Sequence, residues 1–107
     1  NPDFFSYTVS KMGLAGATEL AARKLAPAVR VNAIAPAVTL VSGPQSRDNF
    51  AAAHVLNALR RGVDVADLVR ALLYLVETPT VTGQTLVVDG GQRFLALPRD
   101  VAYMVPE

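Results

Sequence analysis

A tyrosine and a lysine four residues apart, Tyr7 and Lys11, are the pair of side chains in this sequence that is best suited to chemistry. On a helix, residues at this spacing lie on one face and within reach of each other. A free phenol loses its proton only near pH ~10, which is too high for easy proton exchange at neutral pH. An ammonium about 4 Å away favours the phenolate by up to ~4 kcal/mol at an effective dielectric of about 20. The pair therefore indicates a general acid or base with a tuning charge, although an ordinary exposed helix turn carries the same pattern.

The helix that positions this pair is predicted over Ser6–Ala26. The segment is rich in residues that favour helices, and Pro27 ends it. Two glycines inside it each cost ~1 kcal/mol relative to alanine, so they need a reason. They belong to a stripe of small and apolar residues that lets another helix approach closely, unless the stripe is simply an exposed face. Its members are Val9, Gly13, Gly16 and Leu20.

Two short apolar segments, Val29–Ala35 and Gln84–Val88, are predicted as strands of a parallel sheet. The first is β-branched and apolar on both faces except at Arg30 and Asn32, which is typical of a buried strand. We expect Asn32 to satisfy nearby backbone groups. The second follows a turn at Gly83 and ends in two glycines.

A second helix is predicted over Val65–Glu77, with Asp64 as its N-cap and Thr78-Pro79 as its end. The long stretch Pro36–Val63 is expected to be a lid or a binding loop that contains a short helix around Arg47–Leu59. The residues after Gly91 are expected to form a tail.

Helix, strand, loop, helix and strand in this order predict part of an α/β sheet with a crossover connection. Parallel sheets need helices on both faces and more than two strands for stability. We therefore expect the chain to be one part of a larger domain.

Three motifs follow one another along the chain: Ser6–Lys11 (SYTVSK), Arg30–Pro36 (RVNAIAP) and Val81–Gly91 (VTGQTLVVDGG). In this order and spacing they resemble the C-terminal half of the short-chain dehydrogenase/reductase family, over roughly residues 4–92. The resemblance implies a doubly wound parallel sheet of the Rossmann type. It further implies that residues 1–107 are the C-terminal part of one such domain, whose N-terminal cofactor-binding half is absent from this chain.

The resemblance implies a role for each matching residue. Tyr7 resembles the catalytic acid or base that exchanges a proton with the substrate oxygen while hydride moves to or from a nicotinamide. Lys11 resembles the residue that favours the phenolate and binds the nicotinamide ribose. A loop after the first strand resembles the one whose backbone holds the carboxamide, mainly through its last two residues; it consists of Pro36, Ala37, Val38 and Thr39. Ala37 stands where the family usually has glycine, so we expect a slightly different loop path.

The function implied by the resemblance is NAD(P)-dependent oxidoreduction that interconverts a carbonyl and an alcohol, or reduces a related C=N or C=O substrate of pteridine type. The cofactor is then NAD or NADP. The expected partners are a small carbonyl or alcohol substrate, the N-terminal half of the same protein, and further copies in a homodimer or homotetramer. The alternative is a non-catalytic member that keeps the scaffold as a binding or oligomerisation module.

Composition argues against several other classes of function. Ten Lys and Arg against nine Asp and Glu leave a net charge of +1, which gives no basis for binding nucleic acid or a membrane. There is no cysteine, and the single histidine, His54, is expected to be exposed, so no metal site is predicted. No segment resembles a membrane span, and nothing near Asn1 resembles a signal peptide, so we expect a cytoplasmic protein.

Overall fold

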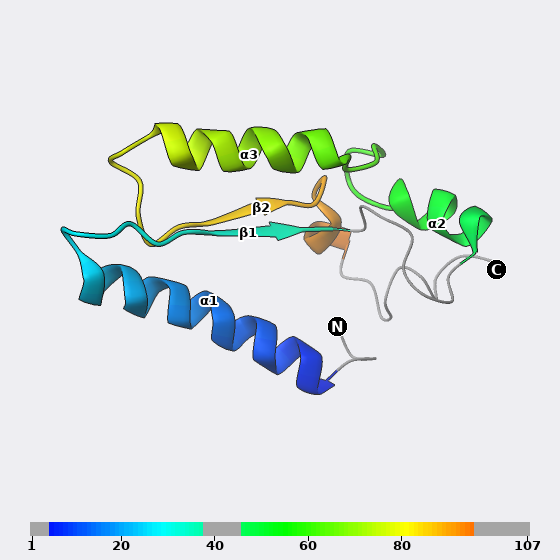
Figure 1. Ribbon diagram of the computed structural model, residues 1–107. Helices are drawn as coiled ribbons and strands as arrows, with labels where there is room; N and C mark the ends of the chain where they lie inside the picture. Colours follow the sequence, from blue (N-terminus) through cyan, green and yellow to red (C-terminus); the bar gives the residue numbers. More distant parts are fainter. Residues whose placement is uncertain (1–4, 38–45, 96–107) are drawn as a thin grey trace.

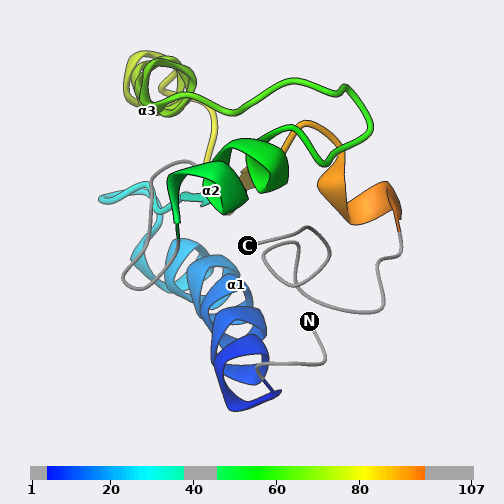
Figure 2. The ribbon, with the colours of Figure 1, turned by 90° about the vertical axis from the view of Figure 1, so that its right-hand side faces the viewer.

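Two helices enclose a small parallel sheet in the computed structural model, which describes residues 5–37 and 46–95 (Figure 1). The helix α1 (Phe5–Leu25) lies on one face of the sheet and α3 (Val65–Glu77) lies on the other. Figure 2 shows the same three layers from a second direction. This arrangement confirms the predicted α/β class, because a helix covers each face of the strands.

The sheet consists of β1 (Ala33–Pro36) and β2 (Thr85–Val88), which run in parallel. Ala33 lies opposite Thr85 and Pro36 lies opposite Val88. The connection between the strands passes through α2 (Arg47–His54) and α3, as a crossover between parallel strands requires. The parallel pairing predicted from the sequence is confirmed.

Both strands are shorter than predicted, because side chains replace some of the backbone hydrogen bonds between the two segments before Ala33. The hydroxyl of Thr82 accepts the N–H of Val31 at 3.1 Å. The Asn32 amide donates to the carbonyl of Val81 at 3.0 Å and accepts the N–H of Gln84 at 3.0 Å. Short polar side chains of this kind compete with regular backbone pairing. The expectation that Asn32 satisfies backbone groups is confirmed, and the groups belong to the segment before β2.

A guanidinium ties the end of α3 to the segment before β1. Arg30 Nη1 donates to the carbonyls of Leu75 and Val81, each at 2.9 Å, and Nη2 donates to the carbonyl of Val76 at 3.2 Å. The last carbonyls of a helix have no partner within the helix, and a cation there also suits the helix dipole. Arg30 therefore holds α3 in place over the sheet.

The helix α3 has the predicted bounds. Its N-cap is Asp64, whose N–H donates to the carboxylate of Asp67 at 2.9 Å. The short helix α2 begins where predicted, after the N-cap Ser46, but it ends at His54 because the chain then folds into a turn. The predicted tail is wrong at its start, since Gln92–Leu95 form the 3-10 helix η1.

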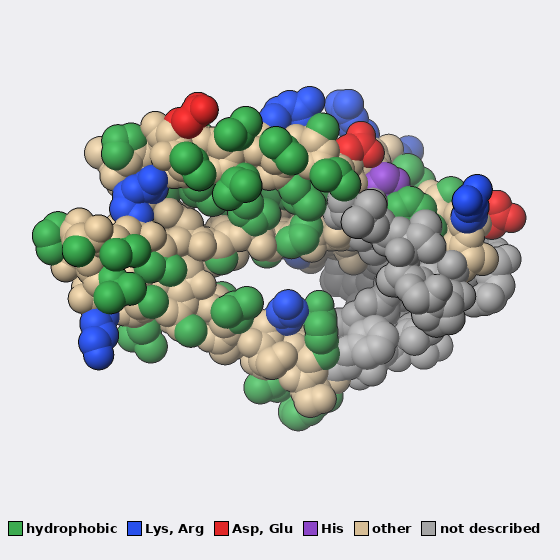
Figure 3. Space-filling model, viewed as in Figure 1, with side chains coloured by type: hydrophobic (Ala, Val, Ile, Leu, Met, Phe, Trp, Pro, Cys, Tyr) green, Lys and Arg blue, Asp and Glu red, His purple; other side chains and the backbone are tan. Residues whose placement is uncertain are grey.

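Few apolar side chains are buried within the described residues. Ala71 and Leu75 of α3 face the sheet, yet one long arc of the same helix is exposed. Figure 3 shows hydrophobic side chains gathered over α3 on the side that faces the viewer. No helix among the described residues combines the length and apolarity needed to cross a membrane. The exposed arc consists of Val65, Val69, Leu72, Leu73 and Val76.

We predict that Arg30→Met in the full-length protein lowers the free energy of unfolding by about 1–3 kcal/mol, because three carbonyls lose a charged donor. Urea denaturation measures the change. The control is Arg23→Met on α1, which removes an exposed ion pair with Glu19 (3.0 Å) and should cost at most about 1 kcal/mol. An equal loss in both variants would contradict the anchoring role of Arg30.

Candidate functional site

The two candidate catalytic residues lie on the face of α1 that is turned towards the sheet. Thr18 and Ala22 are the buried residues of this helix. Tyr7 and Lys11 precede Thr18 by about three and two whole helical turns, so all four side chains share one face. The helix runs antiparallel to β1, which places its first turns at the level of the carboxyl end of that strand (Figure 1).

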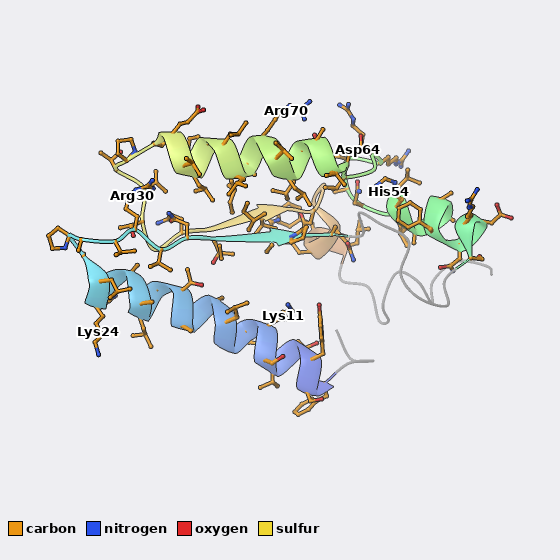
Figure 4. All side chains as sticks on the ribbon, in the orientation of Figure 1. Lys11, Lys24, Arg30, His54, Asp64 and Arg70 are labelled. Atoms are coloured by element: carbon orange, nitrogen blue, oxygen red, sulfur yellow. The ribbon has the colours of Figure 1, made fainter. Side chains whose placement is uncertain are left out.

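Tyr7 and Lys11 are in mutual contact. The Lys11 ammonium lies over the Tyr7 ring, 5.3 Å from its centroid, which is within the range of a cation–π interaction. Figure 4 shows Lys11 on the side of α1 that is turned towards the strands. Both side chains are exposed, Tyr7 by 61%. The four-residue spacing thus brings the two side chains together, and the positive charge of Lys11 lies over the face of the Tyr7 ring.

The first half of α1 is not covered by other described residues. Its contact with the sheet lies near its C-terminal end, where a Cβ added at Gly83 would meet Ala22 at 3.5 Å. Towards its N-terminus the helix diverges from the strands (Figure 1), and Figure 3 shows an opening between them. Within the described residues, Tyr7 and Lys11 therefore lie beside this opening and next to the carboxyl ends of the strands, where α/β sheets bind their ligands.

The loop after β1 begins with Pro36 and Ala37, and the other two predicted cofactor residues, Val38 and Thr39, lie outside the described residues. The Ala37 N–H donates to the carbonyl of Val88 at 3.1 Å, which extends the pairing of the strands by one residue. Among the described residues other than glycine, only Arg60 has a positive φ, so alanine in place of glycine causes no strain at position 37. Proline has no N–H, and that of Ala37 is used. Neither of the first two loop residues therefore has a backbone N–H to offer to a ligand.

The expectation that His54 is a solvated, exposed side chain is wrong. Its ring is partly buried and stacks on Phe50 with 4.8 Å between centroids, while Nε2 lies 2.8 Å from the carbonyl of Val63. A hydrogen bond at this distance requires the protonated Nε2 to donate. His54 thus ties the end of α2 to the residue before the N-cap of α3.

The turn after β2 is organised by the carboxylate of Asp89, whose side chain is only 12% exposed. Oδ1 accepts the Gly91 N–H at 2.8 Å and an Arg93 guanidinium N–H at 2.9 Å, and Oδ2 accepts the Arg93 backbone N–H at 3.2 Å. Burial acts to raise the pKa of this carboxyl, but the two backbone donors and the guanidinium together hold the pKa below its ordinary value of 3.8.

Two hollows lie near the start of β2, at the opposite end of the sheet from Tyr7. One has a volume of about 500 Å³ and lies between the end of α1 and the turn at Gly83. The other has a volume of about 330 Å³ and lies between α3 and the same segment. Neither is lined by a predicted site residue, so neither is the candidate site.

A family model described as enoyl-(acyl carrier protein) reductase matches residues 1–93. The chain belongs to the short-chain dehydrogenase/reductase family. This result confirms the resemblance, and the neighbouring folds confirm the Rossmann-type class.

Three similar proteins illustrate the range of this family. Carbonyl reductase family member 4 of Danio rerio is 37% identical, over 83% of this chain and 38% of its own length. Dihydromonapterin reductase of Citrobacter koseri is 33% identical, over 81% of this chain and 36% of its own length. The structure of FolM alternative dihydrofolate reductase 1 from Brucella suis with NADP is 42% identical, with a TM-score of 0.80 over 90% of this chain and 38% of that one. The chain thus spans little more than a third of each relative.

Some residues that shape this region of the family fold were not found from the sequence. Arg30 was noted only as an exception in an apolar strand, and nothing local indicated that it caps a helix about fifty residues later. The side chain of Asn57 is almost fully buried, and it lies against Gly90, the first of the paired glycines after β2. The paired glycines were the visible signal, because they predict a turn without showing what approaches it.

We predict that Asp89→Asn destabilises the full-length protein by about 1–2 kcal/mol at neutral pH, because charged hydrogen bonds are replaced by weaker ones. A pKa lowered by folding stabilises the protein fully above the ordinary Asp value and loses that effect as the pH falls through the folded value. The difference in the free energy of unfolding between wild type and variant should therefore be constant from about pH 5 to 7 and shrink below about pH 4. Urea denaturation at a series of pH values measures it. A difference that grows on acidification would contradict the assignment.

Proposed function

We propose that the full-length protein is an NAD(P)-dependent oxidoreductase that reduces a carbonyl or a related C=N bond, or oxidises the corresponding alcohol. The observation that carries this proposal is the contact of Tyr7 with Lys11 on the sheet-facing side of α1, level with the carboxyl ends of parallel strands. That end of an open α/β sheet is where ligands bind. Membership of a family of reductases supports the same interpretation.

The described residues fit a nicotinamide cofactor. Lys11 offers an exposed ammonium with three donors, suited to the hydroxyl groups of a ribose. Pro36 and Ala37 form the start of a loop at the end of β1, and backbone donors for the carboxamide then fall to Val38 and Thr39. Some solved relatives hold NADP and others hold NADH or NAD+, which supports this class of cofactor without a preference.

When bound, the reduced cofactor supplies a hydride to the carbon of the substrate. In the proposed mechanism the Tyr7 hydroxyl donates its proton to the substrate oxygen or nitrogen, and a phenolate remains. The Lys11 ammonium stabilises that phenolate through its charge. In the opposite direction the phenolate accepts the proton of the alcohol. A positioned acid of this kind contributes typically ~10²–10⁴-fold to the rate.

Two substrate classes follow from the relatives: a carbonyl compound, as the name of the carbonyl reductase indicates, and a pteridine, as the names of the dihydromonapterin and dihydrofolate reductases indicate. Oxidation of NADH and NADPH by the full-length protein, with an acetoacetyl thioester, 7,8-dihydrofolate and dihydromonapterin, tests the function. Cofactor oxidation with at least one of these supports the proposal. Binding of cofactor without turnover of any would favour the non-catalytic scaffold.

We predict that Tyr7→Phe in the full-length protein lowers kcat by about 10²–10⁴-fold and leaves the Kd of the cofactor nearly unchanged, because only the transferred proton is removed. Tyr74→Phe is the matched control. It makes the same change at an exposed tyrosine of α3, on the other face of the sheet, and should keep full activity. Near-normal turnover by the Tyr7 variant would remove this residue from the mechanism.

We also propose that the N-terminal half of the protein continues the sheet beyond β1. Within the described residues β1 pairs only with β2, so its other edge is open. Figures 1 and 2 together place β1 on the viewer's side of β2, and Figure 3 shows the exposed apolar arc of α3 on that side. Further strands beside β1 would pair with the open edge and cover the arc. The relatives are long enough to supply them.

We predict that residues 1–107 expressed alone show no cooperative thermal transition and bind no dinucleotide, whereas the full-length protein does both. Full burial of an aliphatic side chain stabilises a protein by ~1.5–3 kcal/mol, and the exposed arc contains five. The stabilisation that is lost when these side chains stay exposed is comparable to the whole net stability of a domain, ~5–15 kcal/mol. Calorimetry and NADPH titration test this. A sharp transition in the monomeric fragment would contradict the half-domain proposal.

The stripe on the outer face of α1 is proposed to contact a second copy of the protein. Val9 and Leu20 are 52% and 68% exposed, and a Cβ added at Gly13 or Gly16 would meet nothing within 4 Å. The stripe lies opposite the face that carries Tyr7, so its occupation by another helix leaves the site open.

We predict that Gly16→Leu weakens the assembly of the full-length protein at a cost of about 1–3 kcal/mol, because it overfills a close helix contact. Sedimentation velocity should then show smaller oligomers. The control is Ala17→Leu, which introduces the same side chain at an exposed position beside the stripe and should leave the assembly unchanged. An unchanged assembly of the Gly16 variant would show that this face is not an interface.

A further inference from the structure

The turn after β2 contains the only Asp-Gly bond in the sequence, Asp89–Gly90. Aspartate isomerises most readily before glycine, because glycine has no Cβ to hinder ring closure. The Gly90 nitrogen attacks Cγ of Asp89, a C–N bond forms while a carboxyl C–O bond breaks, and the amide proton leaves with the carboxyl hydroxyl as water. Hydrolysis of the cyclic imide returns one water. Opening at the original main-chain carbonyl leaves isoaspartate, in which the backbone runs through Cγ.

The folded turn opposes both requirements of this ring closure. The carboxyl must be protonated, since a carboxylate has no hydroxyl to release, and it must be free to turn towards the next amide nitrogen. Both oxygens are instead held, because Oδ1 accepts the Gly91 N–H at 2.8 Å and Oδ2 accepts the Arg93 N–H at 3.2 Å. Burial acts to raise the pKa of the Asp89 carboxyl, but these donors and the Arg93 guanidinium hold that pKa below its ordinary value.

The Arg93 guanidinium is the one donor to this carboxylate that a side chain supplies among the described residues. Its Nη1 donates to Oδ1 at 2.9 Å. The guanidinium also lies over the Phe94 ring, 4.4 Å from the centroid, which restricts its movement. Its charge favours the ionised carboxylate, and the 12% exposure of the Asp89 side chain limits screening by water. Arg93 therefore adds protection that a substitution can remove without a change in the backbone donors.

Gly90 has little space for the product of isomerisation. Its carbonyl accepts the Leu59 N–H at 2.9 Å, and a Cβ on Gly90 would lie 2.6 Å from the buried Asn57 side chain. Isoaspartate adds one methylene to the main chain just before Gly90. We expect Gly90 to shift as a result, and its hydrogen bond with Leu59 to open.

We propose that Asp89–Gly90 is a latent site of isoaspartate formation, protected by Arg93 and the backbone donors of the turn, whose conversion releases the turn from Asn57 and Leu59. The proposal concerns main-chain chemistry alone, so it does not rest on the function proposed above.

The test incubates the full-length protein at neutral pH, well below its melting temperature, and measures isoaspartate at Asp89 by peptide mapping with mass spectrometry. Folded wild type should isomerise more slowly than wild type in concentrated urea by on the order of tenfold or more, because the folded turn restrains the carboxyl. Folded Arg93→Met should isomerise about three- to tenfold faster than folded wild type, since one charged donor of a half-exposed pair is lost. Equal rates in either comparison would overturn the proposal.

Two further variants separate protection by Arg93 from general stability. Arg70→Met removes an exposed ion pair with Asp67 at 2.9 Å and should leave the rate at Asp89 unchanged. Arg93→Lys keeps the positive charge and should restore most of the protection, and it decides the matter if Arg93→Met does not fold. An Arg93→Met rate explained entirely by its free energy of unfolding, with no restoration by Lys, would overturn the role of Arg93.

Amide hydrogen exchange by NMR tests the consequence of conversion. In folded protein incubated until Asp89 is partly isomerised, the converted fraction should show a Leu59 amide that exchanges faster by on the order of tenfold or more. The unconverted fraction should keep the slow exchange. Equal exchange of Leu59 in both fractions would overturn the proposed release of the turn.

Discussion

The structure depends on hydrogen bonds between two segments that approach each other just before their strands begin. Asn32 bonds the carbonyl of Val81 and the N–H of Gln84, and Arg30 bonds Val81 and the end of α3. Their amide and guanidinium groups have the donors that these carbonyls need. Because these bonds fix the start of both strands, they also fix the register, and the register brings Pro36 opposite Val88 at the other end. The site at the carboxyl ends thus depends on polar contacts at the amino ends.

The same reasoning explains why two of the three sequence motifs occur together. RVNAIAP supplies Arg30 and Asn32, and VTGQTLVVDGG supplies the backbone groups that they bind. The two motifs therefore bond to each other, and we call this set of hydrogen bonds just before the strands the joint. The third motif, SYTVSK, lies on the first turns of α1 and carries the proposed chemistry, which the joint positions only indirectly through the sheet. A change in the joint should accordingly move the loop after β1 before it affects the helix that carries Tyr7.

The parts of the fold that could be predicted are those that local chemistry decides. The bounds of α3 were predicted to the residue, because an acidic N-cap and a Thr-Pro end mark them. The pairing of Tyr7 with Lys11 followed from helical spacing alone. The start of β1 was predicted too early, because the competition from Asn32 and Thr82 side chains depends on two segments about fifty residues apart. His54 and Asn57 were missed for a similar reason, since their burial depends on how the chain returns from α2 to the turn after β2.

Two faces of α1 and the exposed arc of α3 are three distinct surfaces, and each suits a different neighbour. On α1, the face with Thr18 and Ala22 is buried near the sheet and continues into the exposed pair Tyr7 and Lys11, which is what a site open to reactants requires. The opposite face carries glycines with free space above them, which suits a close contact with another helix. The exposed arc of α3 lies on the side of the open edge of β1, where a strand would satisfy backbone groups and cover apolar surface at once.

A single partner could not serve these surfaces, because the two faces of α1 point in opposite directions and the arc of α3 lies across the sheet. The proposed substrate, second copy and N-terminal half therefore do not compete for one surface.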